Sequence, residues 1–212
     1  MIEVKEQISE VRRTIGSRVL EAGEARVMTI SQAYDTDVDD LWDVVTNPER
    51  IPRWFLPVSG DLREGGKYQF EGNAGGTITR CDRPRSVAAT WEFGGGMSWV
   101  EVRLTPEADG RTRFELEHVA HVEDEHWEKY GPGAVGLGWE GAFWGLANHL
   151  AAPDAPLDPA AVMAWMTSDD GKQFMRLSAD AWAEADIAFG TEPGQARRQA
   201  ENTLKAYLGE EH

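Results

Sequence analysis

The segment FELEHVAHVEDEHW, from Phe114 to Trp127, holds three of the chain's five histidines beside several carboxylates. Imidazole and carboxylate groups together can bind a metal ion or transfer protons. If the first half is a strand, its side chains alternate between faces, and His118 and His121 then point to opposite sides. The other grouping, His121, Glu123 and His126 across a turn, has no recognised ligand spacing. We therefore expect no metal site and a solvated acidic turn.

His118 is the residue of interest in this segment. The same alternation places it with Phe114 and Leu116, on the face of the large apolar side chains. A histidine on the inner face of a sheet is either a hydrogen-bonded core residue or part of a cavity lining. Both interpretations stay open at this point.

Other motifs do not predict a cofactor site. The sequence GPGAVG (131–136) has dinucleotide-binding spacing, but EDEHWEKY precedes it where that motif needs a strand. We expect a turn that leads into a helix. Cys81 is the only cysteine, so no internal disulfide can form, and nothing in the sequence orients it toward His118 as a nucleophile. A small buried apolar role is expected for Cys81, and no cofactor is expected.

The elements that must position these residues fall into three regions. In residues 1–24, Val4, Ile8, Val11, Ile15 and Val19 recur at steps of three and four, which predicts one amphipathic N-terminal helix. This helix would pack on its own domain or, alternatively, form the contact of a homodimer.

The body, residues 25–150, begins with an alternating segment typical of a strand. A helical stripe from Val38 to Val45 follows, with Thr36 and Asp39 resembling a capping box. Segments rich in β-branched and aromatic residues, separated by Gly and Pro, then predict about six antiparallel strands. A long helix, about Gly136 to Leu150, closes the body. Glycines 138, 141 and 145 share one of its faces, which indicates close packing of a neighbouring backbone or, alternatively, room for a ligand.

Residues 151–212 begin with the Pro-rich linker APDAPLDP, and two or three helices follow. We expect this short extension to pack on the body. The overall class is therefore α+β. On the sheet, the strands place Tyr68 with Phe70, Trp91 with Phe93, and Val100 with Val102 on shared faces, which describes either a packed core or an apolar cavity.

Composition excludes several functional classes. The 212 residues carry a net charge of −16, so a nucleic-acid backbone or an anionic membrane surface would repel the chain. No apolar run is long enough to span a membrane, and no signal peptide is visible at the N-terminus. With its single cysteine, the protein is expected to be cytoplasmic.

Long segments of the body resemble a known family. They are YDTDVDDLWDVVTNPERIPRWFLPVSGDLREGGKYQFEG, GGTITRCDRPRSVAATWEF, SWVEVRLTPEADGRTRFELEH and GLGWEGAFWGL. Together, over roughly Arg26 to Leu150, they are similar to the bacterial homologues of the activator of heat-shock protein 90 ATPase, within the SRPBCC (START-like) superfamily. Shorter family motifs match Leu116 with His118, Gly138-Trp139, Arg53-Trp54-Phe55, and Thr90 to Phe93. The C-terminal FMRLSADAWAEADIAFGT is similar to an extension seen in many actinobacterial members.

The resemblance implies a helix-grip fold, in which a curved antiparallel sheet wraps around a long C-terminal helix and leaves a cavity between them. Members include carriers of hydrophobic ligands and polyketide cyclases. The eukaryotic namesake acts on a chaperone through an additional N-terminal domain. The segment before Ala25 is too short to hold such a domain, so we expect no chaperone activation.

Our hypothesis is a binder of a small hydrophobic or amphipathic molecule. His118 would be the polar anchor, with Arg80 as a second polar group, and Trp54 would lie at the mouth of the cavity. The apolar walls would be Phe70, Trp91, Val102, Trp139 and Phe143. Two alternatives stay open. One is a cyclase or hydro-lyase with His118 as its general acid or base, and the other is a protein-interaction module that uses the terminal helices.

Overall fold

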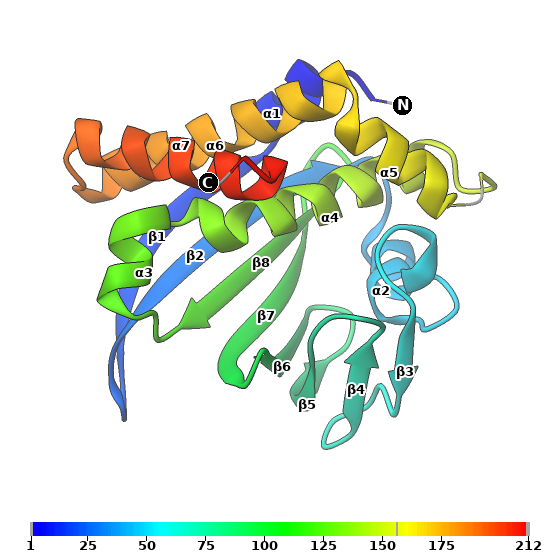
Figure 1. Ribbon diagram of the computed structural model, residues 1–212. Coiled ribbons are helices and arrows are strands. Elements are labelled where there is room, and N and C mark those ends of the chain that lie inside the picture. The colour runs from blue at the N-terminus through cyan, green and yellow to red at the C-terminus, as the bar shows by residue number, and fades with distance from the viewer. Residues whose placement is uncertain (1, 156, 211–212) are drawn as a thin grey trace. The chain divides into compact units, whose positions relative to one another are not determined.

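The computed structural model describes residues 2–155 and 157–210, and Pro156, in the predicted linker, lies outside them. The predicted α+β class is confirmed. The elements are α1 (Val4–Glu10), β1 (Arg12–Leu20), β2 (Gly23–Tyr34), α2 (Val38–Thr46), η1 (Ile51–Arg53), β3 (Val58–Gly60), β4 (Lys67–Phe70), β5 (Gly75–Asp82), β6 (Ser86–Phe93), β7 (Gly96–Pro106), β8 (Thr112–Ala120), α3 (Asp124–Tyr130), α4 (Gly133–Ala151), α5 (Pro159–Thr167), α6 (Asp169–Phe189) and α7 (Pro193–Leu208). The strands form one sheet in the order β1-β2-β8-β7-β6-β5-β4-β3 (Figure 1).

The chain divides into two compact units. The first contains Met1–Met28, His121–Trp144 and Asp158–His212, and the second contains Thr29–Ala120 and Gly145–Leu157. The predicted body, 25–150, is thus shared between the two units.

The second unit is built on an antiparallel meander, β3 to β8. Each of these strands pairs with the next along the chain, with registers such as Ile78↔Ala89, Ala89↔Val100 and Val100↔His118. Because side chains directly opposite each other share a face, this register carries one apolar face across the sheet. These strands agree with the six segments that the sequence predicts.

Helix α2 accompanies this sheet in the second unit. Its N-cap is Asp37, whose carboxylate accepts a hydrogen bond from the backbone N–H of Asp40, and Leu41 and Val44 are buried. The predicted capping pair was wrong by one position, because the Thr36 hydroxyl donates to the Asp40 carboxylate, 2.8 Å away. Arg50 then holds the next turn in place through ion pairs with Asp40 and Asp43.

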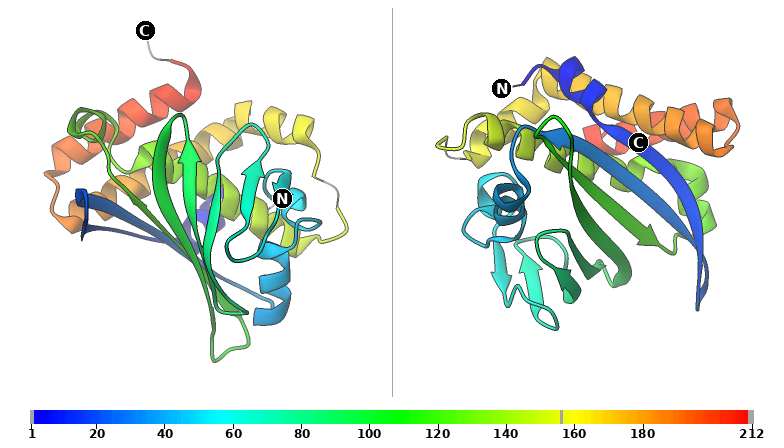
Figure 2. Two further views of the ribbon diagram at one scale, coloured as in Figure 1. Left: turned by 90° about the horizontal axis from the view of Figure 1, so that it is seen from below. Right: turned by 180° about the vertical axis from the view of Figure 1, so that it is seen from behind.

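The first unit is largely helical. Helix α6 packs against α1, β1 and α7, and the right-hand view of Figure 2 shows α6 running along β1. Helix α7 begins as predicted, with Pro193 in its first turn and the Glu192 side chain capping it. Buried polar groups of α7 satisfy the carbonyls at the end of α3, since Gln199 donates to Trp127 and Thr203 donates to Tyr130, both at 2.8 Å. Helix α7 therefore packs on α3 within the first unit.

The N-terminal helix is much shorter than its apolar stripe predicted. Helix α1 ends at Glu10, and the residues from Arg12 form strand β1. Along that strand Ile15 is only half-buried and Val19 is 83% exposed, which a buried helical stripe would not allow. Steps of four fit a strand as well as a helix, because four is also a multiple of two. The backbone pairing in the sheet decided the outcome.

A buried ion pair joins α4 and β1 in the first unit. Glu140, in the middle of α4, is fully buried and pairs with the Arg13 guanidinium of β1, which also donates to the Val11 carbonyl at 2.9 Å. Burial raises the pKa of Glu140, although Arg13 and the indole of Trp182 act in the opposite direction. A charged group at this depth needs its partner, so this pair fixes α4 against β1.

Candidate functional site

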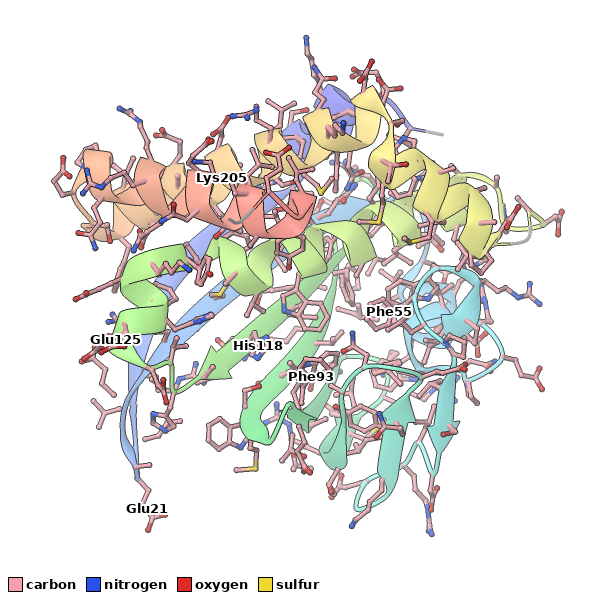
Figure 3. The ribbon with its side chains drawn as sticks, viewed as in Figure 1. Glu21, Phe55, Phe93, His118, Glu125 and Lys205 are labelled. Carbon is pink, nitrogen blue, oxygen red and sulfur yellow. The ribbon has the colours of Figure 1, made fainter. Side chains whose placement is uncertain are left out.

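The second unit carries a continuous row of rings on one face of its sheet. Ring centroids are 5.6 Å apart for Trp54 and Phe55, 5.0 Å for Phe55 and Phe70, 5.8 Å for Phe70 and Trp91, and 6.3 Å for Trp91 and His118. Figure 3 labels two members of this aromatic row, Phe55 and His118. The two tryptophans and the two phenylalanines of the row are only partly buried, whereas His118 is buried, with 6% of its surface exposed.

Strand register explains why three of these rings meet. Phe70 lies on β4, Trp91 on β6 and His118 on β8, and their positions share one face of the sheet. Strands two apart in a sheet are separated by about 9.6 Å. The ring centroids are much closer than that, at 5.8 and 6.3 Å. The side chains therefore converge, as expected on the concave face of a curved sheet.

The other end of the row is held by the turn after α2. The Trp54 indole N–H donates to the Val44 carbonyl at 3.0 Å, so the ring orientation is fixed by α2. A methyl group on Gly145 would collide with the Trp54 carbonyl oxygen. The predicted close packing at this glycine is confirmed, but the neighbour is the Trp54 turn. Gly141 has no atom near its missing side chain.

His118 is a buried polar residue on the face of the aromatic row. Its Nε2 lies 2.8 Å from the hydroxyl of Ser98, and that hydroxyl donates to the Trp91 carbonyl at 3.1 Å. Because a hydroxyl has one hydrogen, Nε2 is the donor toward Ser98 in this arrangement. Burial lowers the pKa of His118 to about 4. The imidazole is therefore neutral at pH 7.

A small apolar core supports the row. It is formed by Tyr68, Ile78 and Ala89, with Phe70 and Trp91 among the half-buried residues packed against it. The Tyr68 hydroxyl donates to the Thr90 carbonyl at 2.6 Å, and burial raises the pKa of this phenol. Tyr68 is therefore neutral as well, and its hydrogen is already used.

Arg80 does not join His118. Its guanidinium pairs with Glu101, whose neighbour Val100 is the residue opposite His118, so Arg80 lies on the other face of the sheet. Strict alternation from the buried Ile78 would have placed Arg80 beside the row. A register shift between Ile78 and Arg80 reverses the faces at this point.

The remaining predicted wall residues are divided. Val102 is half-buried on the face of the row, opposite Val87 and Leu116. Trp139 and Phe143 belong to the first unit, where both are buried. The structure thus brings together Trp54, Phe70, Trp91, Val102 and His118 within one unit.

The acidic segment after β8 contains a short helix in place of the predicted turn. Helix α3 includes His126, whose ring packs against Tyr130, while His121 Nδ1 lies 3.1 Å from the Glu24 carbonyl oxygen. Within residues 2–155 and 157–210, no three His, Cys, Asp or Glu side chains are grouped so that they could hold a metal ion. Cys81 is exposed, so its predicted burial was wrong.

Sequence reasoning missed two members of the site. Phe55 bridges Trp54 and Phe70, and Ser98 is the hydrogen-bond partner of His118. A signal for Ser98 was present, because alternation places it with Val100 on the inner face. Phe55 lies in an irregular turn, where no periodicity reports the direction of a side chain.

Comparison with known proteins is consistent with this arrangement. The family model described as Activator of Hsp90 ATPase homolog 1-like protein matches residues 35–151. The chain belongs to this family. The matched segment includes every member of the aromatic row.

Solved structures extend the similarity. The solution structure of CalU16 from Micromonospora echinospora is 38% identical, with a TM-score of 0.67, over 85% of this chain and 97% of that one. The crystal structure of CalU16 is 36% identical, with a TM-score of 0.63, over 82% and 97%. Protein MLL2253 from Mesorhizobium loti, at 18% identity and a TM-score of 0.54, covers 61% of this chain with its whole length and shows the fold alone. No curated protein matches the chain.

None of the helices in the described part of the chain combines the length and the apolar character that crossing a membrane requires.

Proposed function

We propose that this protein binds a small hydrophobic or amphipathic molecule on the aromatic row of its second unit. The observation that carries the proposal is the row itself, since four large rings stay partly exposed on the same face as a neutral histidine. Partly exposed aromatic side chains beside a few polar groups are typical of ligand sites. Membership of a family with a ligand-binding fold supports the proposal.

The energetics are adequate for useful affinity. Each 200 Å² of apolar surface removed from water contributes about 5 kcal/mol. Part of this is lost to the ordering of the ligand, so a molecule of several rings is needed for micromolar binding. In this proposal, a hydroxyl of the ligand donates a hydrogen bond to the Ser98 oxygen of the His118–Ser98 pair, which fixes the orientation of the ligand.

An acid–base role for His118 is the weaker alternative. With a pKa of about 4, the imidazole holds almost no proton at pH 7, so it is a poor general acid and a weak general base. Ser98 directs its hydrogen to the Trp91 carbonyl, which leaves Nε2 of His118 as donor in that contact. The geometry therefore favours recognition over proton transfer.

We also propose that the protein is cytoplasmic and does not bind nucleic acid. The single cysteine and the net charge of −16 support these two parts.

Native mass spectrometry of gently purified protein tests the function directly. A discrete extra mass that is lost on denaturation, and that is apolar when extracted, is the expected result. Titration with the neutral dye Nile red gives an independent measure of binding. We expect Trp91→Ala to weaken that binding about tenfold, from the lost apolar contact.

Trp99→Ala is the matched control. Trp99 is also half-buried and lies in the neighbouring strand, but it is paired with Thr90 and Val119 on the opposite face. This variant should bind Nile red as the wild type does. Equal loss in both variants, or no dye binding by the wild type, would contradict the proposal.

A further inference from the structure

Charge is sorted strictly between the two faces of the meander. In strands β3 to β8, all of which lie in the described part of the chain, no position on the face of the row is Asp, Glu, Lys or Arg. The opposite face carries an ionic ladder in which Glu101 pairs with Arg80 and Arg103, and Arg103 also pairs with Glu115 and lies 3.6 Å from Glu117. A ligand on the row would therefore meet no charge from these strands.

The polar groups on the face of the row are neutral. Ser98 cannot ionise, Tyr68 uses its hydroxyl hydrogen on the Thr90 carbonyl, and His118 is 6% exposed and lies against Ser98. Each can take part in hydrogen bonds, but none supplies a counter-charge to an ion.

The two arginines near the Trp54 end of the aromatic row are either paired with other side chains or exposed to water. Arg50 is shared between Asp40, at 2.7 Å, and Asp43, at 3.0 Å. Arg53, next to Trp54, is exposed. A hydrated surface arginine provides little compensation for an ion that loses its own water on the row.

The row is also longer than a single ring. From Phe70 through Trp91 to His118 the successive ring centroids are 5.8 and 6.3 Å apart, and Phe55 and Trp54 extend the row past β4 by further steps of 5.0 and 5.6 Å. A ligand that contacts the whole row has several rings or an extended apolar body.

We propose that the site selects uncharged, elongated, ring-bearing molecules and rejects ionised ones that have the same apolar body. This inference rests on the proposed function and adds the chemical class of the ligand. An ionised carboxylate that moves onto this face loses its hydration and gains no partner. We expect it to bind about 100-fold more weakly than a neutral analogue, or weaker still.

The test uses pyrene-1-methanol and pyrene-1-carboxylate, which share four fused rings and differ in charge. Both are titrated into the full chain at pH 7.5 by calorimetry, in about 1 M salt, where the Debye length is about 3 Å. Salt removes the long-range repulsion from the net charge of −16 but leaves the desolvation of the carboxylate in place. The alcohol should bind and the carboxylate should bind at least about 100-fold more weakly.

Three outcomes contradict the inference in different ways. Comparable affinity for the two compounds would overturn the selectivity for neutral ligands while leaving the proposed function in place. Failure of both compounds to bind would overturn the proposed function, and the inference with it. Carboxylate binding that disappears in Arg53→Gln would show that a surface arginine does supply the counter-charge.

A pair of lysine variants separates local from long-range electrostatics. Val100→Lys adds one positive charge beside His118, and Ala88→Lys adds the same charge on the opposite face. Only Val100→Lys should raise carboxylate affinity, by about tenfold or more. If circular dichroism shows that this variant does not fold, Val102→Lys replaces it. An equal gain from Ala88→Lys would attribute the selectivity to net charge and overturn the inference.

Discussion

The His118→Phe variant should be less stable than the wild type at neutral pH but more stable than the wild type at acidic pH. The folded protein holds this imidazole at a pKa of about 4, against 6.5 for an ordinary histidine, because the ring is buried. Between those two values the unfolded chain binds a proton and the folded chain does not, so the stability that His118 contributes is lost as pH falls. Each pKa unit corresponds to about 1.4 kcal/mol, which makes the loss roughly 3 kcal/mol.

His118→Phe keeps a ring in the row but cannot titrate. At pH 7 it should be about 1 kcal/mol less stable than the wild type, because the hydrogen bond to Ser98 is lost. At pH 4 it should be more stable than the wild type by about 2 kcal/mol, the difference between the two terms. Urea unfolding at both pH values, followed by tryptophan fluorescence, measures the crossing.

Histidine Cε1–H signals in an NMR titration provide the direct check. The His118 signal should move only near pH 4. Part of the acid sensitivity should remain in the variant, because burial and the neighbouring arginines also lower the pKa of His149. A His118 signal that titrates near 6.5, or a variant without any crossing, would refute the burial of this imidazole.

Two further predictions concern the scaffold. Arg13→Met should destabilise the protein by about 3–5 kcal/mol, because it leaves Glu140 buried without its partner, and the double variant with Glu140→Leu should recover most of the loss in a urea double-mutant cycle. Additive losses would show that the pair is not coupled. Gly145→Ala should lower the melting temperature because its methyl group meets the Trp54 carbonyl, whereas Gly141→Ala, with open space around it, should be stabilising by up to about 1 kcal/mol. Equal effects of the two alanines in calorimetry would contradict the contact.

Most of the fold could be predicted from the sequence because local signals and tertiary structure agree there. Strands β3 to β7 alternate and end at or shortly before Gly or Pro, and the C-terminal helices α6 and α7 begin at side-chain caps. Strand β1 was predicted as part of a helix because the spacing of its apolar residues fits the period of a helix and that of a strand. Helix α3 was missed because its sequence is polar, and its stability comes from α7, which satisfies its last carbonyls.

The site could be predicted only where the strands are regular. Phe70, Trp91, Val102 and His118 lie on the expected face because alternation holds without interruption around them. The register shift before Arg80 is invisible in the sequence, since one extra residue in a strand changes no composition or motif.

The strand pattern encodes the polarity of the proposed ligand-binding face more clearly than the identity of a ligand. Along β7, alternation gives Ser98, Val100 and Val102 on one face and the charged Glu101 and Arg103 on the other. Only the face of an antiparallel sheet that contacts water needs charged side chains. On the face opposite the aromatic row, these charges form ion pairs between neighbouring strands. The face of the row is then free of charge, and the positions of its rings depend on strand convergence and on the Trp54 turn. The proposed preference for a neutral ligand therefore rests on the strand pattern, whereas the shape of the proposed site depends on contacts that are distant in the sequence.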